Sequence, residues 1–132
     1  MKQKEAIIHL IRSHVPALLA IYAFGSRIAR TSDENSDLDL AVLVDGYAEP
    51  LALFELAGIV ADAAGCSVDL LDLRAASTVM QYQIVTTGLR WWQKDAQAAL
   101  YEAAILSEKT ALDTARMGLM ADIEKRGSVY GR

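Results

Sequence analysis

Hydrophobic and polar residues follow two different periods along this chain, and the changes of period predict alternating helices and strands. Apolar residues at helical spacing predict amphipathic helices over 2–14, 50–64 and 75–87. Short apolar runs predict strands over 18–24, 38–44, 67–73 and 89–93, the first buried on both faces and the last at a sheet edge. Pro50 suits the first turn of the second helix, and Gly65 suits its C-terminal cap. A short polar stretch at 26–31 predicts one or two further helical turns.

The C-terminal part of the chain predicts one long helix, because 95–125 is rich in alanine and contains no proline. At 1.5 Å per residue this helix would extend about 45 Å, longer than a domain of this size is wide. Ile105, Leu112 and Leu119 recur every seven residues and form an apolar stripe. Part of that stripe is therefore expected to contact another chain.

Composition restricts the class of protein. The chain has 132 residues, 53% of them hydrophobic and 23% charged, which predicts a single domain over 1–132 with its own core. The predicted helices and strands make it an α+β domain. Its single cysteine, Cys66, cannot form an internal disulfide, and no apolar run approaches the ~20 residues that span a bilayer. The net charge of −4 argues against a nucleic-acid-binding surface. We expect a cytoplasmic protein with neither membrane nor nucleic acid as a direct partner.

Candidate chemistry is concentrated where the first strand ends and the second begins. Asp37 and Asp39 are two residues apart, so their side chains point to the same face of the strand and repel each other unless a cation lies between them. Mg²⁺ binds one or two carboxylates of this kind and completes its shell with water and substrate phosphates. Gly25 and Ser26 form a turn whose backbone can approach a phosphate closely. The combination indicates transfer of a phosphoryl or nucleotidyl group.

A third carboxylate is expected from the strand at 67–73, which carries Asp69 and Asp72. Their odd spacing places them on opposite faces of the strand, so only one can join Asp37 and Asp39. We select Asp69 because it lies nearer the start of its strand.

Gly25-Ser26, ten intervening residues and then Asp37-Leu38-Asp39 resemble the signature of the nucleotidyltransferase superfamily related to DNA polymerase beta. The short chain is similar to the minimal nucleotidyltransferases. The segments VDLLDL, GLRWWQKD and DIEKRGSVYG further resemble the MntA-type antitoxins of HEPN/MNT toxin–antitoxin systems. The resemblance covers nearly the whole chain, although the specific motif occupies only residues 24–40.

This resemblance implies a nucleotidyltransferase fold, a small mixed sheet flanked by helices with a long C-terminal helix. It implies ATP as the donor, two Mg²⁺ ions, and a tyrosine hydroxyl of a HEPN ribonuclease toxin as the acceptor, within a hetero-oligomer. Carried over by position, Gly25 and Ser26 hold the triphosphate and Asp37 and Asp39 hold the metals. Asp69 is the third carboxylate and metal ligand, and it helps to activate the acceptor hydroxyl.

The chain departs from the family pattern at two places. Arg30 stays a candidate phosphate contact, but Thr31 follows it where the family often has glycine. Trp91 and Trp92 stand where a smaller apolar residue and a tyrosine are usual, and we expect them on opposite faces of their strand. Neither departure affects a candidate metal ligand.

Two other functions stay open at this level. One is a nucleotidyltransferase that modifies a small molecule such as an antibiotic, although 132 residues leave little surface for that acceptor. The other is a non-catalytic antitoxin that neutralises a toxin by covering it, in which the long helix and the C-terminal tail would make the contacts.

Overall fold

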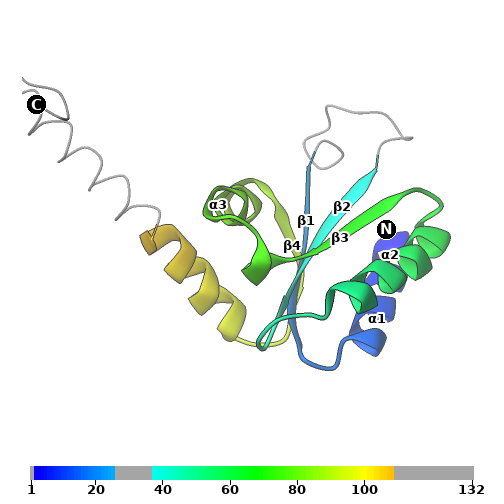
Figure 1. Ribbon diagram of the computed structural model, residues 1–132, viewed down its shortest axis with the longest axis horizontal. Helices are drawn as coiled ribbons and strands as arrows, with labels where there is room; N and C mark the ends of the chain where they lie inside the picture. The colour runs from blue at the N-terminus through cyan, green and yellow to red at the C-terminus, as the bar shows by residue number, and fades with distance from the viewer. Residues whose placement is uncertain (1, 26–36, 109–132) are drawn as a thin grey trace, which may run out of the picture.

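The computed structural model describes residues 2–25 and 37–108, and the chain forms helices on both faces of a four-stranded sheet (Figure 1). In chain order the elements are α1 (Lys2–His14), β1 (Leu18–Phe24), β2 (Leu38–Val44), α2 (Pro50–Ala64), β3 (Val68–Asp72), the 3₁₀ turn η1 (Leu73–Ala75), α3 (Thr78–Thr87) and β4 (Leu89–Gln93). The chain is helical again over residues 97–108. The expected turns at 26–31, and the rest of the long helix with Leu112 and Leu119, lie outside the described residues.

The sheet is mixed, with the strand order β3-β2-β1-β4. Strand β1 pairs antiparallel with β2 and with β4, whereas β2 and β3 run parallel because α2 connects them as a crossover. β1 and β2 lie in the middle and are buried along nearly their whole length, as their continuous apolar sequences predict. The predicted α+β class and the edge position of β4 are confirmed.

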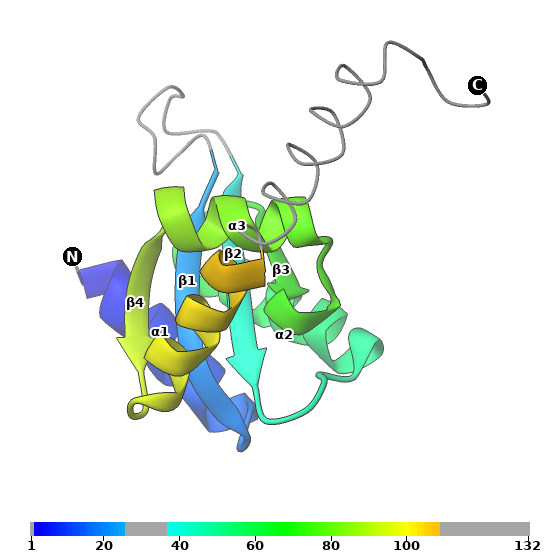
Figure 2. The ribbon, with the colours of Figure 1, turned by 90° about the vertical axis from the view of Figure 1, so that its left-hand side faces the viewer.

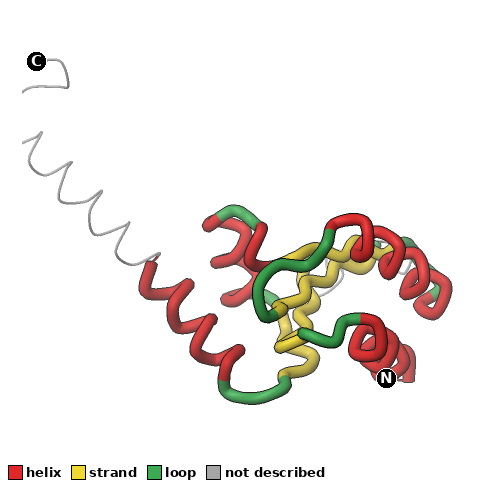
Figure 3. Tube along the Cα trace, turned by 60° about the horizontal axis from the view of Figure 1, so that its bottom comes forward, coloured by secondary structure: helices red, strands yellow, loops and turns green. Residues whose placement is uncertain are grey.

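Each face of the sheet is covered by two helices (Figures 2 and 3). Helices α1 and α2 pack against one face, where Ile11, Leu40 and Val60 are fully buried. Helix α3 and the helix over 97–108 pack against the other face, where Leu43 and Ile84 are fully buried. In the described part of the chain, no helix is long and apolar enough to cross a membrane.

Local signals set the ends of the helices. The carboxylate of Glu49 accepts from the backbone N–H groups of Leu51 and Ala52 at the start of α2, and Gly65 ends that helix in the left-handed region, with φ 75°. Helix α3 begins three residues later than predicted, because η1 occupies 73–75 and the Ser77 hydroxyl then caps the helix. Strand β3 is one residue shorter than predicted at each end.

The two tryptophans of β4 lie on the same face, so the expectation of opposite faces is wrong. The pairing of β1 with β4 shifts register between Ile21 and Tyr22, which leaves Trp91 as the extra residue of a β-bulge. Both indole rings therefore pack against the core on the α1 side, with Lys4 over Trp91 and Arg12 over Trp92.

A partly buried polar contact connects the helix over 97–108 to the sheet. The Tyr22 hydroxyl donates to Glu102 Oε2 at 2.6 Å, and Arg90 Nη1 donates to the same oxygen at 2.8 Å. Tyr22 is 2% exposed, and its burial, followed by the hydrogen bond with Glu102, raises the pKa of its phenol. Ile105 packs into the same core, so this part of the predicted apolar stripe faces its own sheet.

Candidate active site

Gly25 directly follows β1, and its backbone lies against the side chain of the second aspartate of the motif. Phe24 pairs with Asp39 across the two central strands, and Gly25 then turns away with φ 88°. A Cβ at this position would overlap the Oδ2 atom of Asp39. Glycine is therefore required here both for the positive φ and for the close approach of the backbone to the carboxylate. Ser26 and Arg30, the other candidate phosphate contacts, lie outside the described residues.

Asp39 and Asp69 lie side by side on neighbouring strands. The parallel pairing of β2 with β3 puts Asp39 opposite Asp69, and the two side chains share a hydrogen bond. Asp37 precedes β2 and interacts electrostatically with Asp39. Asp37 and Asp69 are exposed, whereas Asp39 is half-buried. The structure thus places Asp39 next to Asp69 and within electrostatic range of Asp37.

The carboxyl group of Asp39 is destabilised in its charged form. Partial burial raises its pKa above the usual value, and the neighbouring charges of Asp69 and then Asp37 raise it further. A hydrogen bond between two carboxyl groups also requires a proton on one of them. A bound cation would relieve this repulsion, so the electrostatics of the three residues fit a cation site.

The donor set fits Mg²⁺ in particular. All three candidate ligands are carboxylate oxygens, which hard cations prefer. Within 2–25 and 37–108, no three or more His, Cys, Asp or Glu side chains form a group that could hold a metal ion. Mg²⁺ in phosphate chemistry is usually held by only one or two carboxylates, and it takes its other ligands from water and from the phosphates of a substrate.

Asp72 has a structural role that separates it from Asp69. Its side chain is 7% exposed and accepts hydrogen bonds from Ala48 N at 2.8 Å and Arg74 N at 3.0 Å. These bonds connect the loop before α2 to the turn after β3. Because Asp72 is an odd number of residues from Asp69, it faces the opposite side of the strand and stays away from Asp39.

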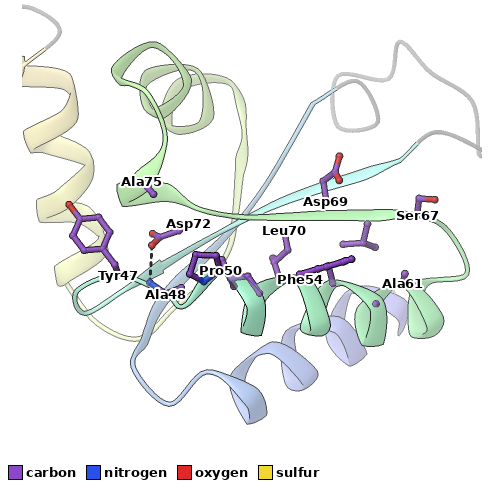
Figure 4. A pocket seen from close by; sticks show the side chains of 14 residues that line it. Tyr47, Ala48, Pro50, Phe54, Ala61, Ser67, Asp69, Leu70, Asp72 and Ala75 are labelled. Atoms are coloured by element: carbon purple, nitrogen blue, oxygen red, sulfur yellow. Dashed lines mark hydrogen bonds between the residues drawn. The ribbon is translucent and has the colours of Figure 1, made fainter.

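Sequence reasoning missed a groove between β3 and α2 (Figure 4). It has a volume of about 890 Å³ and runs from Ser67 and Asp69 at one end to Tyr47 at the other. The floor comes from α2, where Ala57, Gly58 and Ala61 carry little or no side chain. The small residues on one face of the helix were the sequence feature that could have indicated the groove. The sequence does not tell, however, whether another strand covers that face.

A mixed sheet with paired carboxylates on neighbouring strands, next to a glycine turn, defines this chain as a nucleotidyltransferase. The polymerase beta nucleotidyltransferase family model matches residues 5–97, so the chain belongs to that family. The predicted nucleotidyltransferase fold and the resemblance to its minimal members are confirmed.

Individual relatives agree with this assignment. The chain is 38% identical over 120 residues to the protein adenylyltransferase MntA of Shewanella oneidensis, covering 91% of this chain and 86% of the relative. It is also similar to a crystal structure of a toxin–antitoxin with AMP-PNP, with a TM-score of 0.78 and 37% identity over 92% of this chain and 98% of the other. A third similar structure holds a tri-AMPylated Shewanella oneidensis HEPN toxin in complex with MNT antitoxin. Its TM-score is 0.73, with 34% identity over 92% of this chain and 96% of the other.

Proposed function

We propose that this protein is an antitoxin that transfers AMP from ATP to a tyrosine hydroxyl of a partner HEPN ribonuclease toxin and thereby silences it. The observation that carries the proposal is the Asp39–Asp69 pair beside the Gly25 turn, within a chain 38% identical to a protein adenylyltransferase. The AMP-PNP complex of one similar protein supports an adenine nucleotide as the donor. The AMPylated toxin bound to another supports a protein as the acceptor.

Different residues of the site would bind the triphosphate and the metal ions. Gly25 and Ser26 hold the triphosphate, with Arg30 as a further phosphate contact, and Asp37, Asp39 and Asp69 hold the metal ions. When bound, Mg²⁺ would neutralise charge on the phosphates and on the leaving pyrophosphate. Asp69, exposed at the edge strand, is the carboxylate nearest to an arriving acceptor.

The transfer exchanges the α–β phosphoanhydride bond of ATP for a phosphodiester bond to the tyrosine. The phenolic oxygen of the acceptor tyrosine forms a bond to the α-phosphorus of ATP, and the bond from that phosphorus to the bridging oxygen of pyrophosphate breaks. Pyrophosphate leaves with the bonding electron pair, and the phenolic proton passes to Asp69 and then to solvent. The protein contributes mainly by holding the acceptor and donor in line.

The same proposal includes the assembly and its setting. We place the protein in the cytoplasm as a single domain over residues 1–132, in a hetero-oligomer with its toxin. The toxin complexes among the similar structures support this assembly.

Intact-mass spectrometry of the toxin tests the proposal. The HEPN toxin proposed as the partner is incubated with MgATP and the wild-type protein, the Asp37→Asn/Asp39→Asn variant, or the Asp62→Asn variant as a matched control. Asp62 is an exposed carboxylate on α2 outside the groove and the carboxylate site. We expect the toxin to gain whole AMP units with the wild type and with Asp62→Asn, and none with the double variant.

The result separates catalysis from simple covering of the toxin. If the toxin keeps its mass but forms a stable, inactive complex with the wild type, the function is the non-catalytic antitoxin. If the double variant transfers AMP as fast as the wild type, the assigned carboxylates do not perform the reaction. A mass gain on an aminoglycoside but not on the toxin would favour the small-molecule enzyme.

A further inference from the structure

The groove between β3 and α2 is bordered by an open strand edge. Strand β3 is the outermost strand of the sheet and pairs only with β2 among the described strands. Leu38 N donates to Ser67 O at 2.9 Å, so Ser67 and every second residue after it direct their backbone groups toward β2. Val68 and Leu70 therefore direct their N–H and C=O groups outward, over the groove.

The two faces of this edge differ in chemistry. Asp69 points away from α2, whereas Leu70 points down toward α2 (Figure 4). Val68 and Leu70 pack partly against the core beside α2, and Phe54 on that helix is 67% exposed. A strand added beside β3 would thus have apolar neighbours on one face and Asp69 on the other.

The charge of the groove disfavours the triphosphate as its occupant. Asp69 and Asp72 are the charged residues that line it, and no lysine or arginine of the described residues does so. Bound metal ions would neutralise Asp69, but the rest of the groove presents phosphates with the carboxylate of Asp72, whereas backbone N–H groups and apolar side chains meet no such penalty. A polypeptide segment fits this lining better than a nucleotide does.

We infer that the acceptor protein docks an extended segment along β3 as a fifth strand, and that this segment carries the tyrosine to be modified. Its backbone bonds to the outward groups of Val68 and Leu70. Apolar side chains next to the tyrosine enter the groove over Ala57, Gly58 and Ala61. The tyrosine itself, opposite Asp69, then lies on the carboxylate face, because cross-strand neighbours share a face.

This inference rests on the proposed function, and it adds how the acceptor is recognised. The occupant is bound through its backbone and through alternate apolar side chains, a mode used by domains that extend their sheet with a partner strand. The groove continues directly to Asp69, so docking and chemistry take place at one strand.

Two variants test the inference at different contacts. Gly58→Phe fills the groove, and a Cβ at this position meets no atom within 4 Å, so the side chain has room in the free protein. Its matched control is Ala63→Phe, on an exposed position of α2 outside the groove. Val68→Pro removes one outward N–H, a change that edge strands tolerate, and Val68→Ala controls for the lost side chain.

The measurements are kcat/KM for AMP transfer to the toxin and Kd for MgATP, with a thermal melt to show that each variant folds. We expect Gly58→Phe to lower kcat/KM at least about tenfold through a higher KM. Val68→Pro should lower it about threefold to tenfold relative to Val68→Ala, the effect of losing one hydrogen bond. The Kd for MgATP should stay at its wild-type value, and Ala63→Phe should behave like the wild type.

Other outcomes overturn the inference in distinguishable ways. Equal transfer by Gly58→Phe and Ala63→Phe would show that the groove does not hold the acceptor. A weaker Kd for MgATP in Gly58→Phe would assign the groove to the nucleotide, and a wild-type dimer that Gly58→Phe dissociates without loss of transfer would assign it to a second copy. If the wild type transfers no AMP to the toxin, the proposed function itself fails.

Discussion

Asp39 is predicted to destabilise the nucleotide-free fold, so that Asp39→Asn raises stability while it abolishes AMP transfer. The carboxylate is half-buried and faces Asp69 in the register of β2 and β3. An asparagine has nearly the same shape and can donate a hydrogen bond to Asp69. The substitution therefore removes a repulsive charge without creating a cavity.

The magnitude follows from the strand spacing. Neighbouring strands are about 4.8 Å apart, and two unit charges about 5 Å apart repel by about 1 to 3 kcal/mol for an effective dielectric constant between about 80 and 20. Because Asp69 is exposed to solvent, the lower end applies. We expect a gain of about 1 kcal/mol in the free energy of unfolding, or about 3–5 °C in Tm for a domain of this length.

The sign of the pH dependence provides a second readout. The pKa of Asp39 is raised from 3.8 in the folded chain, so between 3.8 and the raised value the folded state binds more protons than the unfolded state. The contribution of Asp39 to stability therefore falls as pH rises through that window. The advantage of Asp39→Asn should grow over the same window and should vanish well below 3.8.

The assay is calorimetric unfolding in EDTA at several pH values, with Asp62→Asn as the matched control for loss of one exposed carboxylate. Added MgATP should then raise the Tm of the wild type and leave Asp39→Asn unchanged, because a ligand stabilises only a fold that binds it. A lower Tm for Asp39→Asn at pH 7, with Asp62→Asn unchanged, would refute the reasoning, since Asp39 would then be a stabilising charge.

Three further substitutions have expected outcomes. Gly25→Ala should abolish AMP transfer and cost at least about 1–2 kcal/mol, because a side chain there is strained at positive φ and overlaps Asp39; normal transfer by a folded Gly25→Ala variant would contradict this. Tyr22→Phe should lower the free energy of unfolding by about 1–3 kcal/mol in denaturant titrations, because Glu102 loses a donor in a partly buried place; an unchanged midpoint would show that this bond adds nothing. Asp72→Ala should lower Tm, because the backbone N–H groups of Ala48 and Arg74 lose their acceptor. The affinity for MgATP, measured at a temperature at which the variant is folded, should equal that of the wild type. Loss of nucleotide binding by the folded variant would place Asp72 in the site.

The central strands could be predicted because strands buried on both faces consist of continuous runs of apolar residues. Strands β1 and β2 coincide with the predicted ranges, and helix α2 begins at Pro50 and ends before Gly65, as the capping rules require. The start of α3 could not be predicted in the same way. The residues of the 3₁₀ turn after β3 fit the apolar spacing of an α-helix. Only the Ser77 cap therefore marks the residue at which α3 begins.

The two tryptophans show a limit of strand periodicity. Alternation assigns Trp91 and Trp92 to opposite faces, but a bulge against β1 inserts one extra residue and returns both rings to the α1 side. A bulge depends on how two strands pair over distance, and the sequence of β4 alone does not encode it. The cations of α1 that lie over the rings confirm the shared face.

At the carboxylate site, too, periodicity predicts part of the arrangement and strand pairing decides the rest. Periodicity alone shows that Asp69 and Asp72 face opposite sides, but only the register of β3 on β2 decides which of them meets Asp39. The strand order places β3 at the edge of the sheet, and neither periodicity nor register predicts that position. Among the described strands, the carboxylate that faces Asp39 therefore belongs to the one whose outer side is unpaired. An inner strand could hold the same metal ligands, but its backbone would already be paired and could not receive an acceptor segment.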